Sequence, residues 1–447
     1  MEIHGDFHVE QSWASTSSPP STLIFSGSTI VIMQIKRAHK VELSPNKVQE
    51  LALAKSAGVA RFAYNYGLEL HARHYKETGK HLSAVSMHKI LCAEKKDKFP
   101  WMYEVSKCAP QEAFYNVEAA FINFFKKRSA HPKFKKKGRS KDSFTLDNSV
   151  FNTKSIRGRG VHLPKIGTVR CKEILSIEGR ILSATVSKDA DRWFISVMQE
   201  VEIDLREEDK PKGNPIGIDL GIKTLVTTSD GEEKQEFVLP YYLDTEEKKI
   251  KRAQKRLSKK AKKSKNWFKQ GIRVARLYRK LRNKRTDFIH KTTTQLAKTK
   301  SVIVMEDLNV KGMVKNHCLA KSISNAAFGE IKRQLEYKTI WYGSELIMVS
   351  RWFPSSKMCS ACGFIKKDLS LSERTWICPD CHTEHERDFN AATNILVEGL
   401  KINTVSHTGI NACGDGSSFV DSSTNQPVVE TRRGQSSILQ NNGGVSS

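Results

Sequence analysis

Residues 216–231 read IGIDLGIKTLVTTSDG. Two apolar runs flank a tight connection and the turn signal SDG closes the second run, so this stretch predicts two adjacent β-strands. Asp219 interrupts the first run, and a carboxylate inside an apolar strand is costly unless it is paired or binds a metal. The stretch is therefore a candidate functional site, although an aspartate at a strand end beside a turn is a common structural feature.

Two further acidic segments follow. Residues 301–308, SVIVMEDL, form a short apolar run that ends in Glu306 and Asp307, either of which could be a ligand. In residues 387–395, RDFNAATNI, Asp388 stands where a helix can begin, and helix capping alone would explain it. Two acids from neighbouring strands and one from a helix could, however, converge on two Mg²⁺ ions, which prefer oxygen ligands and support phosphodiester hydrolysis. A fold that arranges acids in this way is RNase H-like.

Two CxxC pairs lie between these segments, separated by fifteen residues: Cys359, Cys362, Cys378 and Cys381. Four thiolates complete a tetrahedral zinc site without an open position, which indicates a structural zinc. A redox-active CxxC pair is the alternative, and the presence of two pairs disfavours it. No secretory signal is recognisable, so we expect all nine cysteines to be reduced thiols or metal ligands.

The charge of the chain predicts a nucleic-acid partner. There are 74 Lys and Arg against 48 Asp and Glu, a formal charge of +26, although charge alone does not exclude a merely basic surface. Residues 244–291 are the most basic, and their apolar stripes predict two helices joined around 263–266. We expect this hairpin to bind phosphates, with an oligomerisation arm as the less favoured alternative. Its candidate contacts are Lys255, Arg256 and Arg276.

Residues 33–210 combine helical and β patterns. Apolar residues recur at helical spacing within 48–66 and 111–125, whereas 160–201 alternates in short runs, which predicts a small β-barrel with a helical insertion. The basic loop PKFKKK, residues 132–137, suits phosphate contact and stacking. The candidate nucleic-acid contacts here are Tyr64, Asn65, Lys133, Lys135 and Lys136, with core packing or solvent exposure as the alternative for each.

The two ends of the chain differ in composition from the rest. Residues 1–32 contain no Lys or Arg and are rich in Ser and Thr, so we expect a disordered or non-native extension and a biological start at Met33. Residues 401–447 are rich in Ser, Asn and Gly, which predicts a disordered tail. No apolar run approaches the roughly 18 residues of a membrane helix. We therefore expect a soluble protein of a reducing compartment, without a membrane partner.

The motifs occur in an order that resembles the OrfB/TnpB proteins of bacterial insertion sequences. They are GIDLGIKTLVTTSDG, VIVMEDLNVKGM, SSKMCSACG with CPDCH, and ERDFNAATNI. The resemblance extends from about Met33 to Leu400 and includes YNYGLE, PKFKKK, LPKIGTVR and SATVSKDADRW.

This resemblance implies an RNase H-like domain of the RuvC nuclease type at residues 211–400. A zinc ribbon at about 352–386 would interrupt it, and a helix-turn-helix-like recognition region with a β-barrel would precede it. Members of the family are similar to type V CRISPR effectors and cleave double-stranded DNA with a guide RNA from their own element. The resemblance also implies catalytic Mg²⁺ ligands, one structural zinc on the four cysteines, and a supporting role for Asp307. It further implies a cytoplasmic, nucleoid-associated prokaryotic protein. The implied Mg²⁺ ligands are Asp219, Glu306 and Asp388.

Three other functions remain open at this point. A nuclease-inactive, RNA-guided DNA-binding regulator would be expected to lack one of the three acids, and all three are present. A transposase that joins DNA strands would use the same metal ligands. A zinc-ribbon transcription or translation factor would explain the ribbon and the charge but would leave the acids without a role. The sequence does not indicate an oligomeric state.

Overall fold

The computed structural model describes residues 21–25, 28–240, 242–315, 323, 326–370 and 372–409. The chain divides into two compact units, Met1–Leu400 and Lys401–Ser447. The description of the second unit is limited to the end of one helix.

A curled sheet of eight strands forms the first part of the described chain. Its strand order is β3-β7-β8-β2-β6-β5-β4, and β1 pairs with β2. All of its pairings are antiparallel. Buried and partly exposed residues alternate along β8, so one face of the sheet packs against a core around Trp193, Ile195 and Val197. The strands are β1 (Ser21–Phe25), β2 (Ser28–Ser44), β3 (Ser143–Asp147), β4 (Ile156–Arg157), β5 (Gly160–Leu163), β6 (Gly167–Cys171), β7 (Arg180–Asp189) and β8 (Arg192–Arg206).

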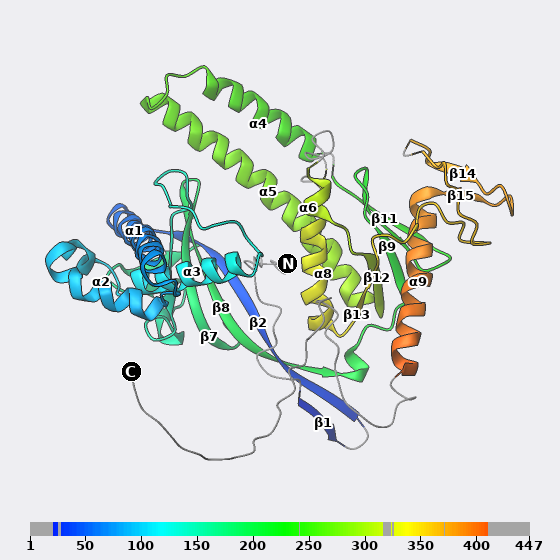
Figure 1. Cartoon of the computed structure of the whole chain (residues 1–447), viewed down its shortest axis with the longest axis horizontal. Helices are drawn as coiled ribbons and strands as arrows, with labels where there is room; N and C mark the ends of the chain where they lie inside the picture. Colours follow the sequence, from blue (N-terminus) through cyan, green and yellow to red (C-terminus); the bar gives the residue numbers. More distant parts are fainter. Residues whose placement is uncertain are drawn as a thin grey trace, which may run out of the picture. The chain divides into compact units, whose positions relative to one another are not determined.

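A helical insertion separates β2 from β3, as predicted. It contains α1 (Lys47–Thr78), α2 (Ala84–Lys98) and α3 (Cys108–Phe125), which lie together in Figure 1. Asn46 begins α1 with a capping box: its side chain accepts a hydrogen bond from the backbone N–H of Gln49, and the Gln49 side chain accepts one from the backbone N–H of Asn46. The three helices share a core that includes Leu68, Met87 and Phe114.

A second, mixed sheet follows, with strand order β11-β10-β9-β12-β13. Its strands are β9 (Ile216–Asp219), β10 (Thr224–Ser229), β11 (Lys234–Val238), β12 (Val302–Glu306) and β13 (Glu345–Val349). The strands β9, β12 and β13 run parallel, whereas β10 is antiparallel to both of its neighbours.

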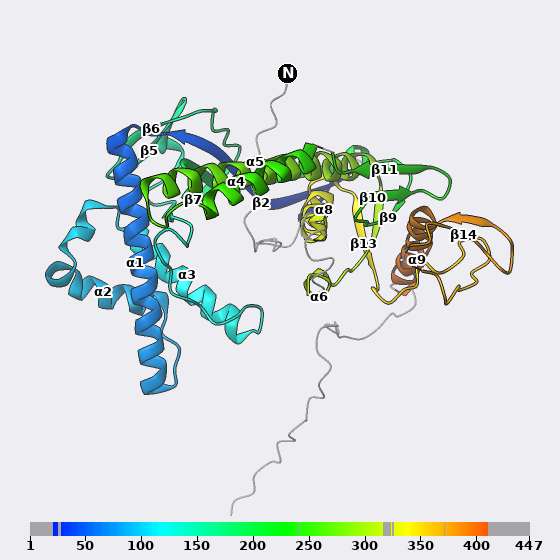
Figure 2. The ribbon, with the colours of Figure 1, turned by 90° about the horizontal axis from the view of Figure 1, so that it is seen from above.

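Helices cover both faces of this sheet. On one face, α5 (Lys265–Thr299) and α8 (Phe328–Tyr342) share a core with Ile218 and Ile303. On the other face, α9 (Arg387–Gly409) packs Ile395 and Leu396 against Val304. Figure 2 shows α8 and α9 on opposite sides of β13.

The remaining elements lie between or beside these layers. α4 (Tyr242–Ser258) and α5 form the predicted helical hairpin, which breaks between residues 258 and 265. α6 (Val310–Met313) follows β12, and β14 (Thr375–Ile377) pairs with β15 (Glu384–Glu386) as a two-stranded sheet. None of the described helices is long and apolar enough to cross a membrane.

The structure corrects the predicted disorder at the two ends. Residues 21–25 and 28–32 are β-strand, and Ile30 pairs with Arg206 of β8. Likewise α9 continues to Gly409, so residues 401–409 are helical. The apolar and β-branched residues of STLIF (21–25) and STIVI (28–32) favour strands despite the Ser- and Thr-rich composition of residues 1–32, and α9 simply continues beyond residue 400. Residues 1–20 and 410–447 lie outside the described part of the chain, and the start at Met33 stays a prediction.

Candidate active site and metal centre

Asp219 and Glu306 lie at the carboxyl ends of two neighbouring parallel strands. β9 ends at Asp219 and β12 ends at Glu306. Met305 pairs with Ile218, so continuing the register by one residue places Glu306 beside Asp219. In sheets with parallel strands, ligands bind at this edge.

Asp388 reaches the same edge from α9, where it lies in the first turn. Two glycines allow that helix to pack closely against the sheet. A Cβ built on Gly217 would lie 2.7 Å from the backbone nitrogen of Leu396 and closer still to the carbonyl oxygen of Ala392. A Cβ on Gly399 would overlap the side chain of Val304. The absence of these two side chains therefore sets how near α9 approaches β9 and β12.

The three acids interact electrostatically. Burial, together with the negative charges of Glu306 and Asp388, raises the pKa of Asp219 from its ordinary 3.8 to about 7. Burial also raises the pKa of Glu306, against the opposing effect of the Ser355 hydroxyl, which donates a hydrogen bond to its Oε1. Arg374 Nη1 lies 3.2 Å from each carboxylate oxygen of Asp388. Such a cluster of acids fits a divalent cation, because bound positive charge removes the cost of ionising adjacent carboxyls.

Asp307 has different partners. Its carboxylate forms ion pairs with Lys332 and Arg351. The hydrogen bond from Lys332, followed by that from Arg351, holds the pKa of Asp307 below its ordinary value. Two cations thus already neutralise Asp307, whereas Glu306 accepts a hydrogen bond from the neutral hydroxyl of Ser355.

The four cysteines converge. Their Sγ atoms all lie within 4.8 Å of one another. Among the described residues, no other group of three or more His, Cys, Asp or Glu side chains lies so close together. Sγ of Cys359 is 3.5 Å from Sγ of Cys381, and Sγ of Cys362 is 3.6 Å from Sγ of Cys378. The three acids are not drawn together to that extent. Four convergent thiols fit one tetrahedral metal ion.

His385 is a residue of the metal centre that the sequence reasoning missed. It is buried, its Nε2 lies 2.9 Å from Sγ of Cys359, and its ring packs beside Trp376. It therefore supports a ligand cysteine from the two-stranded sheet. The only signal in the sequence was a histidine four residues after the last cysteine.

Two asparagines of α9 connect the metal centre to the acids. Nδ2 of Asn394 donates to the carbonyl oxygens of Ser355, at 2.8 Å, and of Met358, at 2.6 Å. Oδ1 of Asn390 accepts from the backbone N–H of Ser360 at 3.0 Å. Both asparagines are buried. The segment leading into the first CxxC pair is thus bonded to the helix that carries Asp388, and its Ser355 contacts Glu306. Buried asparagines four residues apart in RDFNAATNI were the available signal.

Three of the residues predicted as nucleic-acid contacts hold a loop in place. The backbone N–H of Lys135 donates to Oδ1 of Asn65 at 2.7 Å, and Nδ2 of Asn65 donates to the carbonyl oxygen of Lys135 at 2.9 Å. Nζ of Lys135 lies 3.8 Å from the ring centre of Tyr64, which is buried. These contacts fasten the basic loop to α1, and a role of the three residues in nucleic-acid binding stays a prediction. Lys133 and Lys136 remain exposed.

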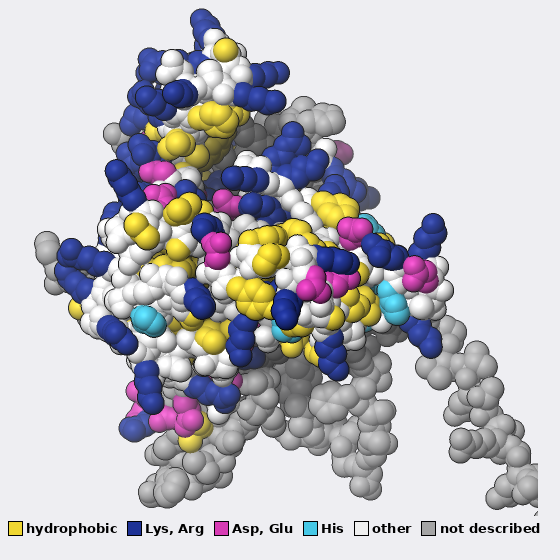
Figure 3. Space-filling view, turned by 90° about the vertical axis from the view of Figure 1, so that its left-hand side faces the viewer, with side chains coloured by type: hydrophobic (Ala, Val, Ile, Leu, Met, Phe, Trp, Pro, Cys, Tyr) yellow, Lys and Arg dark blue, Asp and Glu magenta, His cyan; other side chains and the backbone are white. Residues whose placement is uncertain are grey.

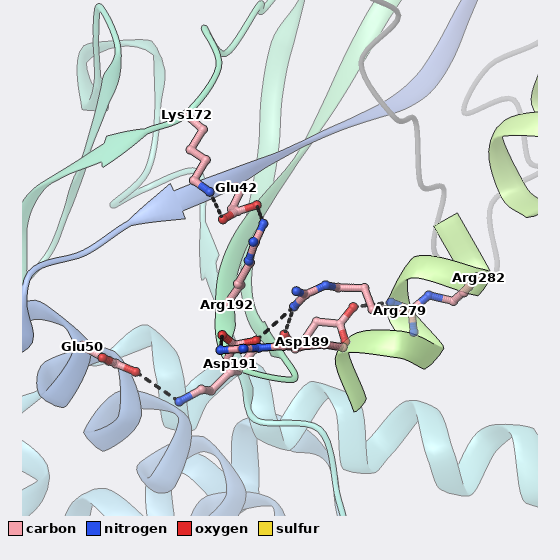
Figure 4. A network of polar contacts seen from close by, with 10 residues as sticks. Glu42, Glu50, Lys172, Asp189, Asp191, Arg192, Arg279 and Arg282 are labelled. Atoms are coloured by element: carbon pink, nitrogen blue, oxygen red, sulfur yellow. Dashed lines mark hydrogen bonds and ion pairs between the residues drawn. The ribbon is translucent and has the colours of Figure 1, made fainter. Parts of the chain in front are cut away.

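Arginines of α5 are bonded to the turn between β7 and β8 (Figure 4). Arg276 Nη2 lies 2.7 Å from Asp191, Arg279 donates to the carbonyl oxygen of Asp189 at 2.7 Å, and Arg282 forms an ion pair with Asp189. Arg276, predicted as a nucleic-acid contact, is thus engaged with Asp191. Lys255 and Arg256 of α4 are exposed. Figure 3 shows Lys and Arg side chains gathered over the hairpin.

A basic cavity of about 470 Å³ lies beside this junction. Asp189 is its one acid, and hydroxyl groups of Thr185, Ser187 and Ser196 also line it. Its five cationic lining residues are Lys40, Arg139, Lys141, Lys188 and Arg282. Cations and hydroxyl donors together are the groups that contact nucleic-acid phosphates.

Comparison with known proteins agrees with these features. The IS605 OrfB family described as "Probable transposase" matches residues 195–317, its "Helix-turn-helix domain" matches residues 33–80, and a "Cas12f1-like, TNB domain" matches residues 328–395. A solved complex of Cas12f1 with single-guide RNA and target DNA shares the fold, with a TM-score of 0.50 at 17% identity over 78% of this chain and 82% of that one.

Two relatives match most of the sequence. One, from Streptomyces pristinaespiralis and described as a candidate RNA-guided DNA endonuclease, is 35% identical over 92% of this chain and 97% of its own length. Another with that description, from Escherichia coli K12, is 31% identical over 82% of this chain and 93% of its own length. This protein therefore belongs to the OrfB/TnpB family of insertion-sequence proteins.

Proposed function

We propose that this protein is a transposon-associated, RNA-guided DNA endonuclease with an RNase H-like site of the RuvC type. The observation that carries the proposal is the meeting of three acids from β9, β12 and α9 at one sheet edge, where the pKa of Asp219 is raised to about 7. A structural role does not require three acids to approach one another, whereas metal-assisted hydrolysis does.

Asp219, Glu306 and Asp388 would hold two Mg²⁺ ions. Glu306 and Asp388 both raise the pKa of Asp219, which supports a single site to which all three acids would contribute ligands. Bound there, Mg²⁺ supplies Lewis-acid activation of water and stabilisation of the leaving oxygen. Ser355 orients Glu306 through its hydrogen bond, and Arg374 orients Asp388 through its contacts with both oxygens. The four cysteines would hold one structural zinc.

Guide RNA and double-stranded DNA are the proposed partners. The relatives are described as RNA-guided DNA endonucleases, and the solved Cas12f1 complex contains single-guide RNA and target DNA. In guided nucleases, base pairing reads the sequence while the protein binds the backbone through cationic surfaces. The exposed Lys and Arg of the α4–α5 hairpin and the basic cavity beside Arg282 would provide such surfaces here. The RNA would come from the element that encodes the protein.

Guidance can be tested on protein purified with RNA expressed from its own locus. We expect one defined RNA to copurify, and Mg²⁺-dependent cleavage of duplex DNA that matches its guide segment but not of a scrambled duplex. Random cellular RNA, or equal cleavage of both duplexes, would contradict guidance. Joined DNA strands among the products would instead support a strand-transfer transposase. Guide-dependent binding without cleavage would support the regulator.

A further inference from the structure

Trp352 is the most exposed large hydrophobic side chain among the described residues, with 87% of its surface accessible. It lies in the segment between β13 and the first CxxC pair. Isolated hydrophobic residues on a surface are common, so exposure alone carries no function. The position of this indole relative to the three acids is the informative feature.

Contacts on both sides of Trp352 lead to the acidic cluster. The preceding residue, Arg351, forms an ion pair with Asp307, which directly follows Glu306. Three residues after the tryptophan, the Ser355 hydroxyl donates to Glu306 itself. The indole is therefore presented by a short segment whose two ends are bonded to two consecutive acids at the end of β12.

The backbone around Trp352 is held in one conformation. The N–H of Phe353 donates to the carbonyl oxygen of Ser350 at 3.0 Å, which closes a β-turn with Trp352 at its third position. Phe353 is partly buried against the core formed by Val304 and Ile347. The buried side of Phe353 anchors this turn while the indole of Trp352 stays in solvent. Binding of a ligand to the indole would therefore lose little conformational entropy of the backbone.

We propose that Trp352 stacks on an unpaired base of the DNA strand that occupies the acidic cluster. This inference rests on the proposed nuclease function and specifies its substrate as single-stranded at that point. An exposed indole offers a π-face to one base, and such stacking tolerates any sequence. A base inside a duplex is already stacked on both faces, so the strand must be unpaired to make this contact. Lys332 and Arg351, beside the turn, are paired with Asp307.

The test is a double-mutant cycle between the protein and the DNA. The full chain with its RNA is compared with Trp352→Ala and Trp352→Phe on duplex targets in which the strand to be cleaved carries a single abasic site, scanned one position at a time. On intact DNA, Trp352→Ala should reduce kcat/KM by about 5- to 150-fold, the range for stacking of one base on an aromatic side chain. Trp352→Phe should retain most of the activity. At one or two abasic positions, the wild type should lose the same factor, and Trp352→Ala should show no further loss.

Ile174→Ala is a matched control, because Ile174 is 63% exposed and lies outside the proposed site, and it should cleave like the wild type. Stacking is refuted if Trp352→Ala cleaves intact DNA at the wild-type rate, or if its defect is equal at every abasic position. Failure of the nuclease function is a separate outcome, recognised by unchanged cleavage in Asp219→Ala.

A binding measurement tests stacking independently of cleavage. In the Asp219→Ala protein with RNA and target DNA, 2-aminopurine placed at the identified position should be quenched by the indole. The quenching should disappear in the Asp219→Ala/Trp352→Ala double variant, and equal fluorescence in the two proteins would contradict the proposal.

Discussion

Replacement of Gly217 by alanine tests how the structure brings Asp388 to the sheet. The added Cβ would lie 2.7 Å from the nitrogen and 2.9 Å from the Cβ of Leu396, whereas ordinary contacts lie at 3.4–4 Å. The carbonyl oxygen of Ala392 would lie closer still, so helix α9 must move away from β9 by about 1 Å. Overpacking of this kind costs about 1–3 kcal/mol of folding free energy. A misplacement of about 1 Å within an active site can reduce the rate about 100-fold.

The assay for Gly217→Ala combines thermal unfolding with single-turnover cleavage of a guide-matched duplex. We expect a melting temperature lower by several degrees and a cleavage rate reduced about 100-fold, with RNA binding retained. Gly329→Ala is the matched control, because no atom lies within 4 Å of the added Cβ. If Gly217→Ala unfolds and cleaves like the wild type, the close approach of α9 does not position Asp388 and this reasoning is wrong.

Three further predictions follow from the contacts of the acids and the cysteines. Ser355→Ala removes the hydroxyl that donates to Glu306 and should weaken Mg²⁺ binding about 10- to 100-fold, measured as the Mg²⁺ concentration for half-maximal cleavage; an unchanged concentration would contradict this role. Cys378→Ser should lose the bound zinc, as measured by metal analysis. Its cleavage rate should fall at least about tenfold, because Asn390 and Asn394 bond the first CxxC segment to the helix that carries Asp388. Full cleavage activity without zinc would contradict this link between the metal centre and the acids. Asp219, whose pKa is raised to about 7, keeps a proton in the folded metal-free protein that the unfolded chain loses above about pH 4, so its contribution to stability should fall as pH rises from about 4 to 7. Asp219→Asn should remove this part of the pH dependence in thermal unfolding without metal, and identical pH profiles would refute the assignment.

The residues that carry the chemistry could be predicted because they lie in short local motifs. The turn signals around IGIDLG, the apolar run ending at Glu306 and the spacing of the CxxC pairs each constrain a few consecutive residues. Their order along the chain then identified the family, which the comparisons confirmed. The catalytic roles of Asp219, Glu306 and Asp388 stay predictions until they are measured.

The supporting contacts could not be predicted, because they join residues that are distant in sequence. Ser355 meets Glu306 across 49 residues, and Asn65 meets Lys135 across 70 residues. A one-dimensional pattern reads Tyr64 and Lys135 as an aromatic and a cation available to nucleic acid. Only the folded chain shows that they contact each other. The close packing of Gly217 on α9 is equally invisible in the sequence, where IGIDLG reads as a strand and a turn.

The central claim is that Asp219, Glu306 and Asp388 form one Mg²⁺-dependent active site. The most direct test measures Mg²⁺-dependent cleavage of a guide-matched duplex by wild type, Asp219→Asn, Glu306→Gln and Asp388→Asn, each purified with its RNA and its zinc. The account predicts that the three variants bind RNA and target DNA like the wild type but lose at least about 1,000-fold in cleavage rate, because each substitution removes a charged metal ligand. Cleavage near the wild-type rate by Asp219→Asn, or cleavage by the wild type after divalent metals other than the bound zinc are removed, would contradict it.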